Sequence, residues 1–286
     1  MSNFVLHHKS FTVMLPDKVI AIYCFADDLL KSIGHKTKEG CRTTDAEIIT
    51  TALVGALIFK GNQSVSISYM RSDNMAPRLP KKSGFTKRLH GLCDLLYALF
   101  QQLGHLIKQL NVSHRYMLDS FPLAVCQNIR IPRCKLLKGK EYRGFCASKQ
   151  QYFYGVKVQV ITTEEGLLVE VCFVPGAEHD AEALSQLLWD FEQGDQIYED
   201  SAYTCYVFED MAKEAGIEVL TARKSNSKRK DEPYAAYLKN HYRKRIETTF
   251  SAITDLFPKT WHCVSTKGFF IKALLFLMAY QFDKIV

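Results

Sequence analysis

Apolar residues recur at helical spacing from about residue 17 to residue 110, and strand signals in this region are weak. The segment TTDAEIITTALVGALIF places Thr44 and Glu47 just before an apolar run, a capping-box pattern that predicts the start of a helix. The segment GLCDLLYALFQQLGHLIKQL repeats leucine and phenylalanine with the same period. The pattern therefore predicts a helical N-terminal region.

The pattern changes after residue 112, where strand-like runs alternate with helical ones. SHRYMLDSF predicts a strand that Pro122 stops, and QYFYGVKVQVITT and LLVEVCFV predict a hairpin joined by EEG. Next come a helix from about residue 180 to 191, a strand at QIYED, a helix at YVFEDMAKEAG, a strand at IEVLTA and a long helix over about 235–256. Five strands among helices favour an α/β fold with a central mixed sheet flanked by helices.

The longest apolar stretch, FFIKALLFLMAYQF, covers residues 269–282. Lys272 interrupts it, and it is shorter than the about 20 residues that cross a bilayer, so we expect a helix buried in the core and no membrane partner. The N-terminal residues lack a sustained apolar run, and we expect no signal peptide. Nine cysteines without a C-x-x-C pair favour reduced thiols in a cytoplasm over a zinc finger or a disulfide scaffold.

The charge balance narrows the class of partner only slightly. Lysine and arginine outnumber aspartate and glutamate by 37 to 30, which gives a formal net charge of +7. This excess favours a polyanionic partner, although ordinary solubilising charge explains it as well.

Three acidic residues lie at informative places in the predicted fold. Asp119 is at or near the end of the first strand, and Asp200 ends the strand at QIYED. If these strands are neighbours, both carboxylates lie at one edge of the sheet. Glu247 lies on the last helix, at the margin of an apolar stripe that is expected to pack on the sheet. The stripe consists of Ile246, Phe250, Ile253 and Phe257.

Three converging carboxylates require a cation, because two unit charges about 4 Å apart cost about 4 kcal/mol at an effective dielectric near 20. An all-oxygen ligand set suits Mg²⁺ or Mn²⁺, and two such ions can support an in-line phosphoryl displacement. Each acid alone has a simpler explanation, since aspartate at a strand end is commonly a turn or cap residue and glutamate on a helix is usually solvated. The ordered set of three makes the metal hypothesis competitive.

Other polar residues near these acids are assigned to simpler roles. Strand alternation sends Glu199 to the face opposite Asp200, so we expect it to take no part in the metal site. Asp180 precedes a helical segment and is interpreted as its N-cap rather than as a metal ligand with His179. His241 is either an accessory ligand or an exposed residue.

Basic residues form two runs near the predicted active-site edge and a third in the N-terminal region. The first run lies in RIPRCKLLKGKEYRGFCASK, where Tyr142 and Phe145 could also stack on an unpaired base; it suits DNA phosphates or forms a solvated loop. The second run follows the last strand, where DNA contact is the better hypothesis. The third, RSDNMAPRLPKKSGFTKRLH, is equally compatible with a DNA contact and a solvated linker. The candidates in the first two runs are Arg130, Arg133, Lys135, Lys138, Lys140, Arg143, Arg223, Lys224, Lys228 and Arg229.

Several segments together resemble a known family. MLDSFP, YFYGVKVQVITT, VPGAEHDAEAL, IYEDSAY, LTARKSNSKRK and RKRIETTFSAITDLFPK are similar to successive blocks of the insertion sequence 982 family, bacterial transposases of the DDE type. The resemblance is strong over residues 112–286 and weaker before them. It implies an RNase H-like catalytic domain at about 111–286, preceded by a smaller helical domain at 1–110 for DNA binding or assembly.

The resemblance also implies roles for individual residues. Asp119, Asp200 and Glu247 match the three catalytic, metal-binding acids, which are expected to hold two Mg²⁺ or Mn²⁺ ions. Related transposases carry a Tyr, Arg, Glu, Lys signature around the last acid; here only Arg243 and Glu247 match it, since Asn240 and Thr254 occupy the other positions. Arg243 either steadies the scissile phosphate or pairs with Glu247 one turn away.

The implied activity is metal-dependent cleavage of DNA at the element's ends, followed by strand transfer into target DNA. The implied partners are terminal inverted repeats, target DNA and further copies of the chain, in a dimer or larger synaptic complex in the bacterial cytoplasm at the nucleoid. Two alternatives stay open: an RNase H-like nuclease without strand transfer, and an inactive DNA-binding relic.

Overall fold

The structure of the protein is a computed structural model that describes residues 15–147 and 149–286, with the backbone alone at residue 243. Contacts between Cα atoms divide the chain into two compact units, which are described separately. The helical unit extends to Gln102 and includes residues 253–259 and 267–286. The sheet unit comprises residues 103–252 and 260–266.

The helical unit has the helices that the apolar spacing predicts. The expected capping box is present at the start of α2, where Thr44 Oγ1 accepts from the Glu47 N–H and Glu47 Oε2 accepts from the Thr44 N–H. The apolar C-terminal segment forms a buried helix, α9, as predicted. The helices of this unit are α1 (Leu15–Ser32), α2 (Asp45–Phe59), α3 (Gln63–Ser72), α4 (Lys82–Gly91), the first part of α5 (Cys93–Leu110) and most of α9 (Thr266–Ile285).

The C-terminal helix packs with the N-terminal helices. Lys18 of α1 donates to Asp283 at 2.7 Å, and the rings of Phe25 and Phe282 pack edge to face with centroids 5.1 Å apart. This grouping differs from the expected division after residue 110, which placed the whole segment 111–286 in one domain. An apolar helix is buried wherever it finds an apolar partner, and the sequence pattern of α9 does not specify that partner.

The sheet unit has the predicted mixed sheet. Along the main path the strand order is β2-β3-β1-β5-β6, and β4 also pairs with β3. The pairs β1/β3 and β3/β4 are antiparallel, whereas β1/β5 and β5/β6 are parallel. The five predicted strands are all present, and a short strand that was not expected, β2, adds a sixth. The strands are β1 (Arg115–Cys126), β2 (Arg143–Cys146), β3 (Gln151–Thr163), β4 (Leu168–Pro175), β5 (Gln196–Glu199) and β6 (Glu218–Thr221).

The first strand is longer than predicted, because Pro122 does not stop it. β5 pairs with β1 only as far as Leu118 and Glu199, so beyond that point β1 has β3 as its neighbour on one side alone. Proline is tolerated at such an edge position, where its missing N–H removes no ladder bond on the open side. Asp119 therefore lies in the middle of β1, at the point where the parallel pairing ends.

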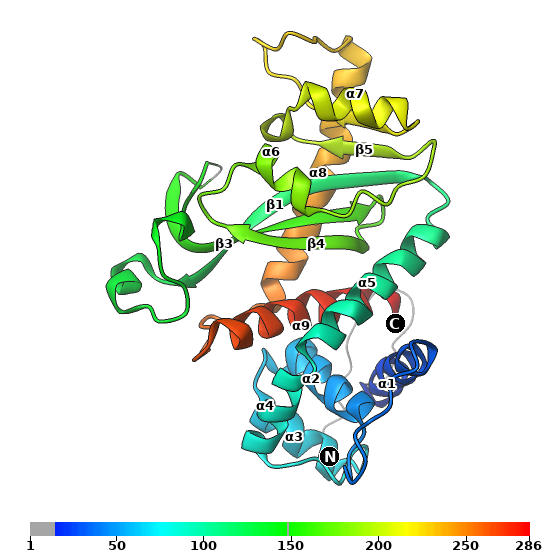
Figure 1. Cartoon of the computed structure of the whole chain (residues 1–286), viewed down its shortest axis with the longest axis vertical. Helices are drawn as coiled ribbons and strands as arrows, with labels where there is room; N and C mark the ends of the chain where they lie inside the picture. The colour runs from blue at the N-terminus through cyan, green and yellow to red at the C-terminus, as the bar shows by residue number, and fades with distance from the viewer. Residues whose placement is uncertain (1–14, 148) are drawn as a thin grey trace. The chain divides into compact units, whose positions relative to one another are not determined.

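Helices cover both faces of the sheet. In Figure 1, α8 runs behind the sheet and α6 lies in front of it. The long helix predicted over 235–256 is confirmed, whereas the helix predicted over 180–191 is reduced to α6 and one turn of 3-10 helix. The helices are α6 (Asp180–Ala183), α7 (Tyr206–Glu214) and α8 (Pro233–Leu256), with 3-10 turns η1 (Asn128–Arg133), η2 (Lys140–Tyr142), η3 (Leu184–Gln186) and η4 (Ser201–Tyr203).

The early end of α6 has a packing explanation. Leu187 takes an extended conformation, and two aromatic residues that follow it pack against other elements. The ring of Trp189 lies 4.4 Å from that of Phe208 on α7, and the ring of Phe191 lies 5.0 Å from that of Tyr116 on β1. These contacts override the local helix propensity of the segment.

No single helix among the described residues is long and apolar enough to cross a membrane; only α2 and α3 taken together, with a bend of 111° between them, meet that test of length and composition.

Candidate active site and nucleic-acid interface

The register of β1 and β5 brings two of the three predicted acids side by side. Leu118 pairs with Glu199 across the parallel ladder, so the next positions, Asp119 and Asp200, are neighbours at the point where β5 ends. Both side chains are half-buried. Asp119 lies within β1 rather than at the end of its strand as predicted, and it is a neighbour of Asp200 because the parallel ladder stops one residue before each of them.

Strand alternation fixes the face on which these acids lie. Met117 and Tyr198, two residues before Asp119 and Asp200, pack in one apolar cluster with Ile246 of α8. The ring of Phe121, two residues after Asp119, lies 4.9 Å from that of Phe250, also on α8. Both aspartates therefore belong to the face of the sheet that α8 covers.

The third acid, Glu247, lies on α8 at the margin of this packed stripe, as predicted. Ile246 is 1% exposed and anchors the helix, whereas Glu247 is exposed. Within residues 15–147 and 149–286, no three histidine, cysteine, aspartate or glutamate side chains are arranged to hold a metal ion. The structure therefore brings Asp119 and Asp200 together without gathering Glu247 to them, and the set of three stays a prediction.

Each aspartate is held by the backbone of the serine that follows it. The N–H of Ser120 donates to Asp119 Oδ1 at 2.7 Å, and the N–H of Ser201 donates to Asp200 Oδ1 at 2.6 Å. Asp200 is also the N-cap of η4, so the turn role considered for it is real. These bonds fix the orientation of the two carboxylates.

The donor chemistry of this pair fits a hard divalent cation. The available oxygens belong to two neighbouring carboxylates, one within β1 and one just after β5, and carboxylate oxygens are the type of ligand that Mg²⁺ and Mn²⁺ prefer. The pair alone leaves most positions of such an ion to other oxygens.

Glu199 lies on the opposite face, as strand alternation requires. Its side chain is 3% exposed, Oε1 accepts from Thr221 Oγ1 at 2.6 Å, and Oε2 has no hydrogen-bond partner among the described residues. Burial raises the pKa of Glu199 to about 8. A carboxyl group in this position is neutral at pH 7 and unsuited to bind a cation alongside Asp200.

A family comparison decides the class of protein. Residues 110–262, just over half of the chain, match the family model described as a transposase DDE domain. The chain belongs to the DDE-domain transposases. The match spans both aspartates and Glu247 together with every strand of the mixed sheet, whose order corresponds to an RNase H-like fold.

Two further comparisons concern solved structures and curated proteins. The cryo-EM structure of a piggyBac transposase synaptic complex with hairpin DNA is similar to this transposase, with a TM-score of 0.40 and 8% sequence identity. The similarity covers 94% of this chain and 73% of that one. The comparison with curated proteins gives no match.

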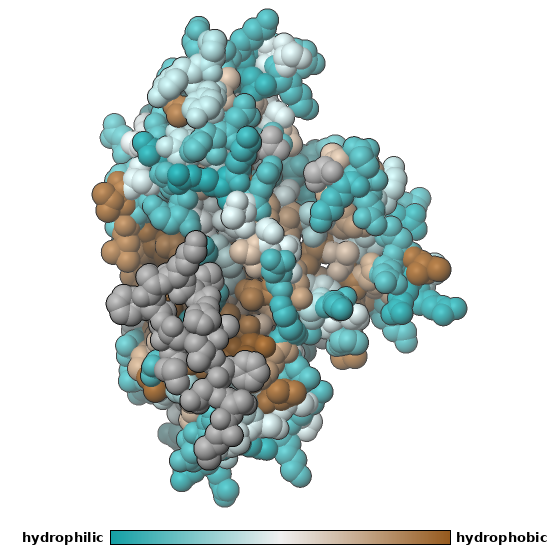
Figure 2. Space-filling model, turned by 180° about the vertical axis from the view of Figure 1, so that it is seen from behind, coloured by the Kyte–Doolittle hydropathy of each residue, from teal (hydrophilic) through white to brown (hydrophobic). Residues whose placement is uncertain are grey.

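The first basic run forms an exposed lobe of the transposase, made by residues 127–147 and 149–152 and here called the basic lobe. All six predicted DNA contacts in it are exposed, and none forms an ion pair within the part of the chain that the structure describes. The lobe is largely hydrophilic in the rear view (Figure 2). Its six predicted contacts are Arg130, Arg133, Lys135, Lys138, Lys140 and Arg143.

The aromatic residues of the basic lobe are arranged differently from the expectation. Tyr142 packs against Tyr154, with ring centroids 6.3 Å apart. Phe145 lies directly opposite Tyr152 in the β2/β3 ladder, and these two exposed rings are 4.9 Å apart. The β3 ladder separates Tyr152 from Asp119 by eight residues, or about 27 Å at about 3.4 Å per residue. Any base that stacks there is distant from the aspartates.

The second basic run divides into internal and exposed residues. Arg223 is mostly buried and pairs with Glu209, and Arg229 pairs with Asp210 through both terminal nitrogens at 2.8 Å. The internal position of Arg223 differs from its predicted role in DNA binding, whereas Arg229 is 45% exposed and its DNA contact stays a prediction. Lys224 and Lys228 are exposed, as that role requires. The side chain of Arg243, also predicted to contact DNA, lies outside the described residues.

Sequence reasoning assigned Asp180 to an N-cap, and the structure gives it a different position. His179 is the residue at the cap of α6, and Asp180 is its first residue. The carboxylate of Asp180 accepts from Ser120, Lys157 and Gln159, whose side chains project from β1 and β3. The signal available in the sequence was the alternation of Lys157 and Gln159 with buried apolar residues on β3, which places two polar side chains on one face.

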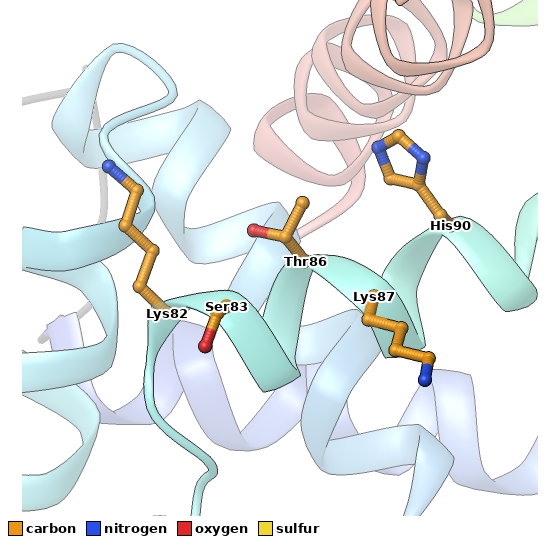
Figure 3. Close-up of a pocket in the computed structure, with 5 residues that line it drawn as sticks. All are labelled: Lys82, Ser83, Thr86, Lys87 and His90. Atoms are coloured by element: carbon orange, nitrogen blue, oxygen red, sulfur yellow. The ribbon is translucent and has the colours of Figure 1, made fainter.

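The helical unit has a basic surface on α4. Lys82, Ser83, Thr86, Lys87 and His90 line a surface hollow of about 710 Å³, and their side chains project from this one helix (Figure 3). The other side of α4 is anchored by Phe85 and Leu89, which are buried. α4 has no acidic residue, and its exposed side presents the ammonium groups of Lys82 and Lys87, two hydroxyl groups and the imidazole of His90.

Proposed function

We propose that this chain is an insertion-sequence transposase, similar to the insertion sequence 982 family, that cleaves DNA at the element's ends and joins the freed ends to target DNA. The proposed cofactor is Mg²⁺ or Mn²⁺, with two ions held by Asp119, Asp200 and Glu247. The proposed partners are the terminal inverted repeats, the target DNA and at least one further copy of the chain.

One observation carries this proposal: Asp119 and Asp200 lie side by side at the end of the β1/β5 ladder, on the face that α8 covers. The family match spans the same residues and Glu247. Two adjacent carboxylates in a half-buried position are unfavourable unless a cation joins them. Their orientation by the amides of Ser120 and Ser201 supports a prepared ligand pair.

The chain's own residues would perform three tasks. Asp119 and Asp200 would hold the cofactor, and Glu247 would complete the ligand set when α8 and the DNA adopt their bound arrangement. A divalent cation supplies Lewis-acid activation of the attacking oxygen and stabilisation of the leaving oxygen. The basic lobe would bind phosphates of the same duplex at a distance from the scissile bond.

The helical unit is proposed to bind DNA through α4. Its exposed side combines two lysines, a histidine and two hydroxyl side chains, which suit phosphate oxygens and base edges in a groove. Pairing of two ends in a synaptic complex would follow from binding by two or more copies of the chain.

The test is a cleavage assay with the purified full chain, Mg²⁺ and a duplex that contains the element's own end sequence. We expect nicking at the end and joined products when target DNA is present. Asp119→Asn, Asp200→Asn and Glu247→Gln should each abolish cleavage while retaining DNA binding. Glu199→Gln is the matched control, because it changes the neighbouring carboxyl group on the opposite face.

The outcomes separate the candidate functions. Cleavage without joined products would identify a nuclease without strand transfer, and DNA binding without cleavage would identify an inactive relic. Cleavage that survives one of the three acid substitutions would remove that residue from the catalytic set.

A further inference from the structure

A single carboxylate oxygen connects three side chains directly behind the proposed active site. Asp180 Oδ1 accepts from Ser120 Oγ at 3.1 Å, from Gln159 Nε2 at 3.0 Å and from Lys157 Nζ at 3.2 Å. These donors project from β1 and β3 on the face of the sheet that lies opposite Asp119. Asp180 therefore ties α6 to both central strands next to the first acid.

The same network continues to the second acid through two fully buried side chains. Gln159 is 0% exposed, and its Oε1 accepts from the hydroxyl of Tyr203, which is 1% exposed. Burial, reinforced by the charges of Asp119 and Asp180, raises the pKa of Tyr203 well above its ordinary value, so the hydroxyl remains a donor. The N–H of Tyr203 donates to the carbonyl of Asp200 at 3.0 Å.

The two ends of this network have the same local form. At one end the amide of Ser120 holds the carboxylate of Asp119, and at the other the amide of Ser201 holds that of Asp200. A continuous hydrogen-bonded path thus connects one Asp-Ser pair to the other through Asp180, Gln159 and Tyr203.

We propose that Asp180, Gln159 and Tyr203 are positioning residues that hold the two Asp-Ser pairs at a fixed separation suited to a divalent cation. This inference rests on the proposed function. The segment that carries Asp200 needs such support, because β5 has only four residues and its partner on the other side, β6, also has four. Folding then already holds the two carboxylates close together. Their mutual repulsion lowers the stability of the folded protein, and the free energy of cation binding does not have to overcome it.

The experiment compares Tyr203→Phe with a matched control, Tyr154→Phe. Each substitution removes one buried hydroxyl from the sheet unit; the hydroxyl of Tyr154 donates to the Leu137 carbonyl at 3.1 Å, in the part of β3 that pairs with β2. Mn²⁺ affinity is measured on the full chain without DNA, by titration calorimetry. We expect Tyr203→Phe to weaken Mn²⁺ binding about tenfold, as removal of a supporting group around a metal site commonly does, and Tyr154→Phe to leave it unchanged.

A second readout needs no metal. Amide hydrogen exchange in EDTA should show faster exchange at Ser201 in Tyr203→Phe than in the wild type, and no change there in Tyr154→Phe. Should Tyr203→Phe fail to fold, Ser120→Ala removes one donor to Asp180 but keeps the backbone amide that holds Asp119. It should give the same weakening of Mn²⁺ binding, and wild-type affinity in this variant would overturn the proposal.

The results distinguish this inference from the proposed function. If the wild type binds Mn²⁺ and Tyr203→Phe binds it equally well, the positioning role is wrong and the proposed function stands. Equal weakening in Tyr154→Phe would also overturn the positioning role, since removal of any buried hydrogen bond would then suffice. If the wild type binds no Mn²⁺, the proposed metal site fails, and the exchange rate at Ser201 still decides whether the network orders the Asp200 turn.

Discussion

The guanidinium group of Arg223 donates two hydrogen bonds to the carboxylate of Glu209, at 2.8 and 2.5 Å, and both side chains are at most 10% exposed. Burial alone would raise the pKa of Glu209, but the bonds and charge of Arg223 outweigh it and lower the pKa. We therefore expect Arg223→Ala to lower the free energy of unfolding by about 3 kcal/mol, since the buried carboxylate then keeps only the longer contacts from Arg229 Nη1 at 3.3 Å and Thr221 Oγ1 at 3.2 Å. Urea denaturation measures this change.

Lys224, the next residue, is the matched control for Arg223. It is exposed, so Lys224→Ala should change the unfolding free energy by no more than about 0.5 kcal/mol and should weaken DNA binding. If Arg223→Ala left stability unchanged and weakened DNA binding instead, the internal role of Arg223 would be wrong.

The pKa of Glu199 gives a prediction for the pH dependence of stability. Its value of about 8 in the folded protein lies above the ordinary value of 4.5, so the folded state keeps a proton that the unfolded chain releases. Stability from this group is therefore complete below about pH 4.5 and falls as pH rises towards 8. The slope is at most about 1.4 kcal/mol per pH unit.

Glu199→Gln tests this slope, because glutamine resembles the neutral carboxyl group and does not titrate. Denaturation curves in EDTA between pH 5.5 and 7.5 should show a shallower decline of the unfolding free energy for the variant than for the wild type. Parallel declines would mean that Glu199 is ionised in the folded protein.

The exposed lysines of the basic lobe should contact DNA phosphates. Replacing Lys135, Lys138 and Lys140 together by alanine should weaken binding to all duplex sequences and reduce the slope of log affinity against log salt by about 0.9 for each lysine that binds a phosphate. Fluorescence anisotropy at several salt concentrations measures both effects. Lys213→Ala, an exposed change on α7, is the control; a triple variant with the salt slope of this control would exclude the basic lobe from the interface.

Gly155 occupies a position that no side chain can share. A Cβ atom there would lie 2.0 Å from the carbonyl oxygen of Leu123 on β1, so Gly155→Ala must displace β3 from β1. We expect the unfolding free energy to fall by more than about 3 kcal/mol, or no folded protein, by thermal unfolding. Gly91→Ala, with open space around its Cβ, should be neutral or stabilise α4 by up to about 1 kcal/mol. Equal stability of the two variants would contradict the close approach of β1 and β3.

The strands could be predicted because they depend on short-range patterns, whereas the adjacency of Asp119 and Asp200 also requires β1 to pair with β5, which the sequence analysis could state only as a condition. Alternation on β3 and β4 and the turn between them determine the hairpin, and the next positions after Leu118 and Glu199 follow from parallel pairing. The position of the Glu247 carboxylate is harder to predict. Helical spacing places the residue on α8 but does not determine how far its carboxylate lies from the sheet edge.

Other features depended on partners distant in the sequence. The sequence around Arg223 does not distinguish it from Lys224. In the structure Arg223 is buried because it pairs with Glu209 on α7, whereas Lys224 is exposed. Likewise, Asp180 has the local sequence of a helix cap, and only the folded sheet brings Ser120 and Gln159 to its carboxylate. Long-range pairing of polar groups is the information that a single sequence lacks.

The discontinuous helical unit has a practical consequence for dividing the protein. A fragment that begins after residue 110 would retain α9 but lack α1, and with it the partners of Asp283 and Phe282. Every side chain of α9 from Ala273 to Phe282 is buried in the intact chain, and this apolar surface would lack its cover in that fragment. We expect a fragment that begins after residue 110 to aggregate rather than to fold as an independent catalytic domain. A fragment that also ends before residue 253 lacks α9 and therefore does not expose its apolar surface.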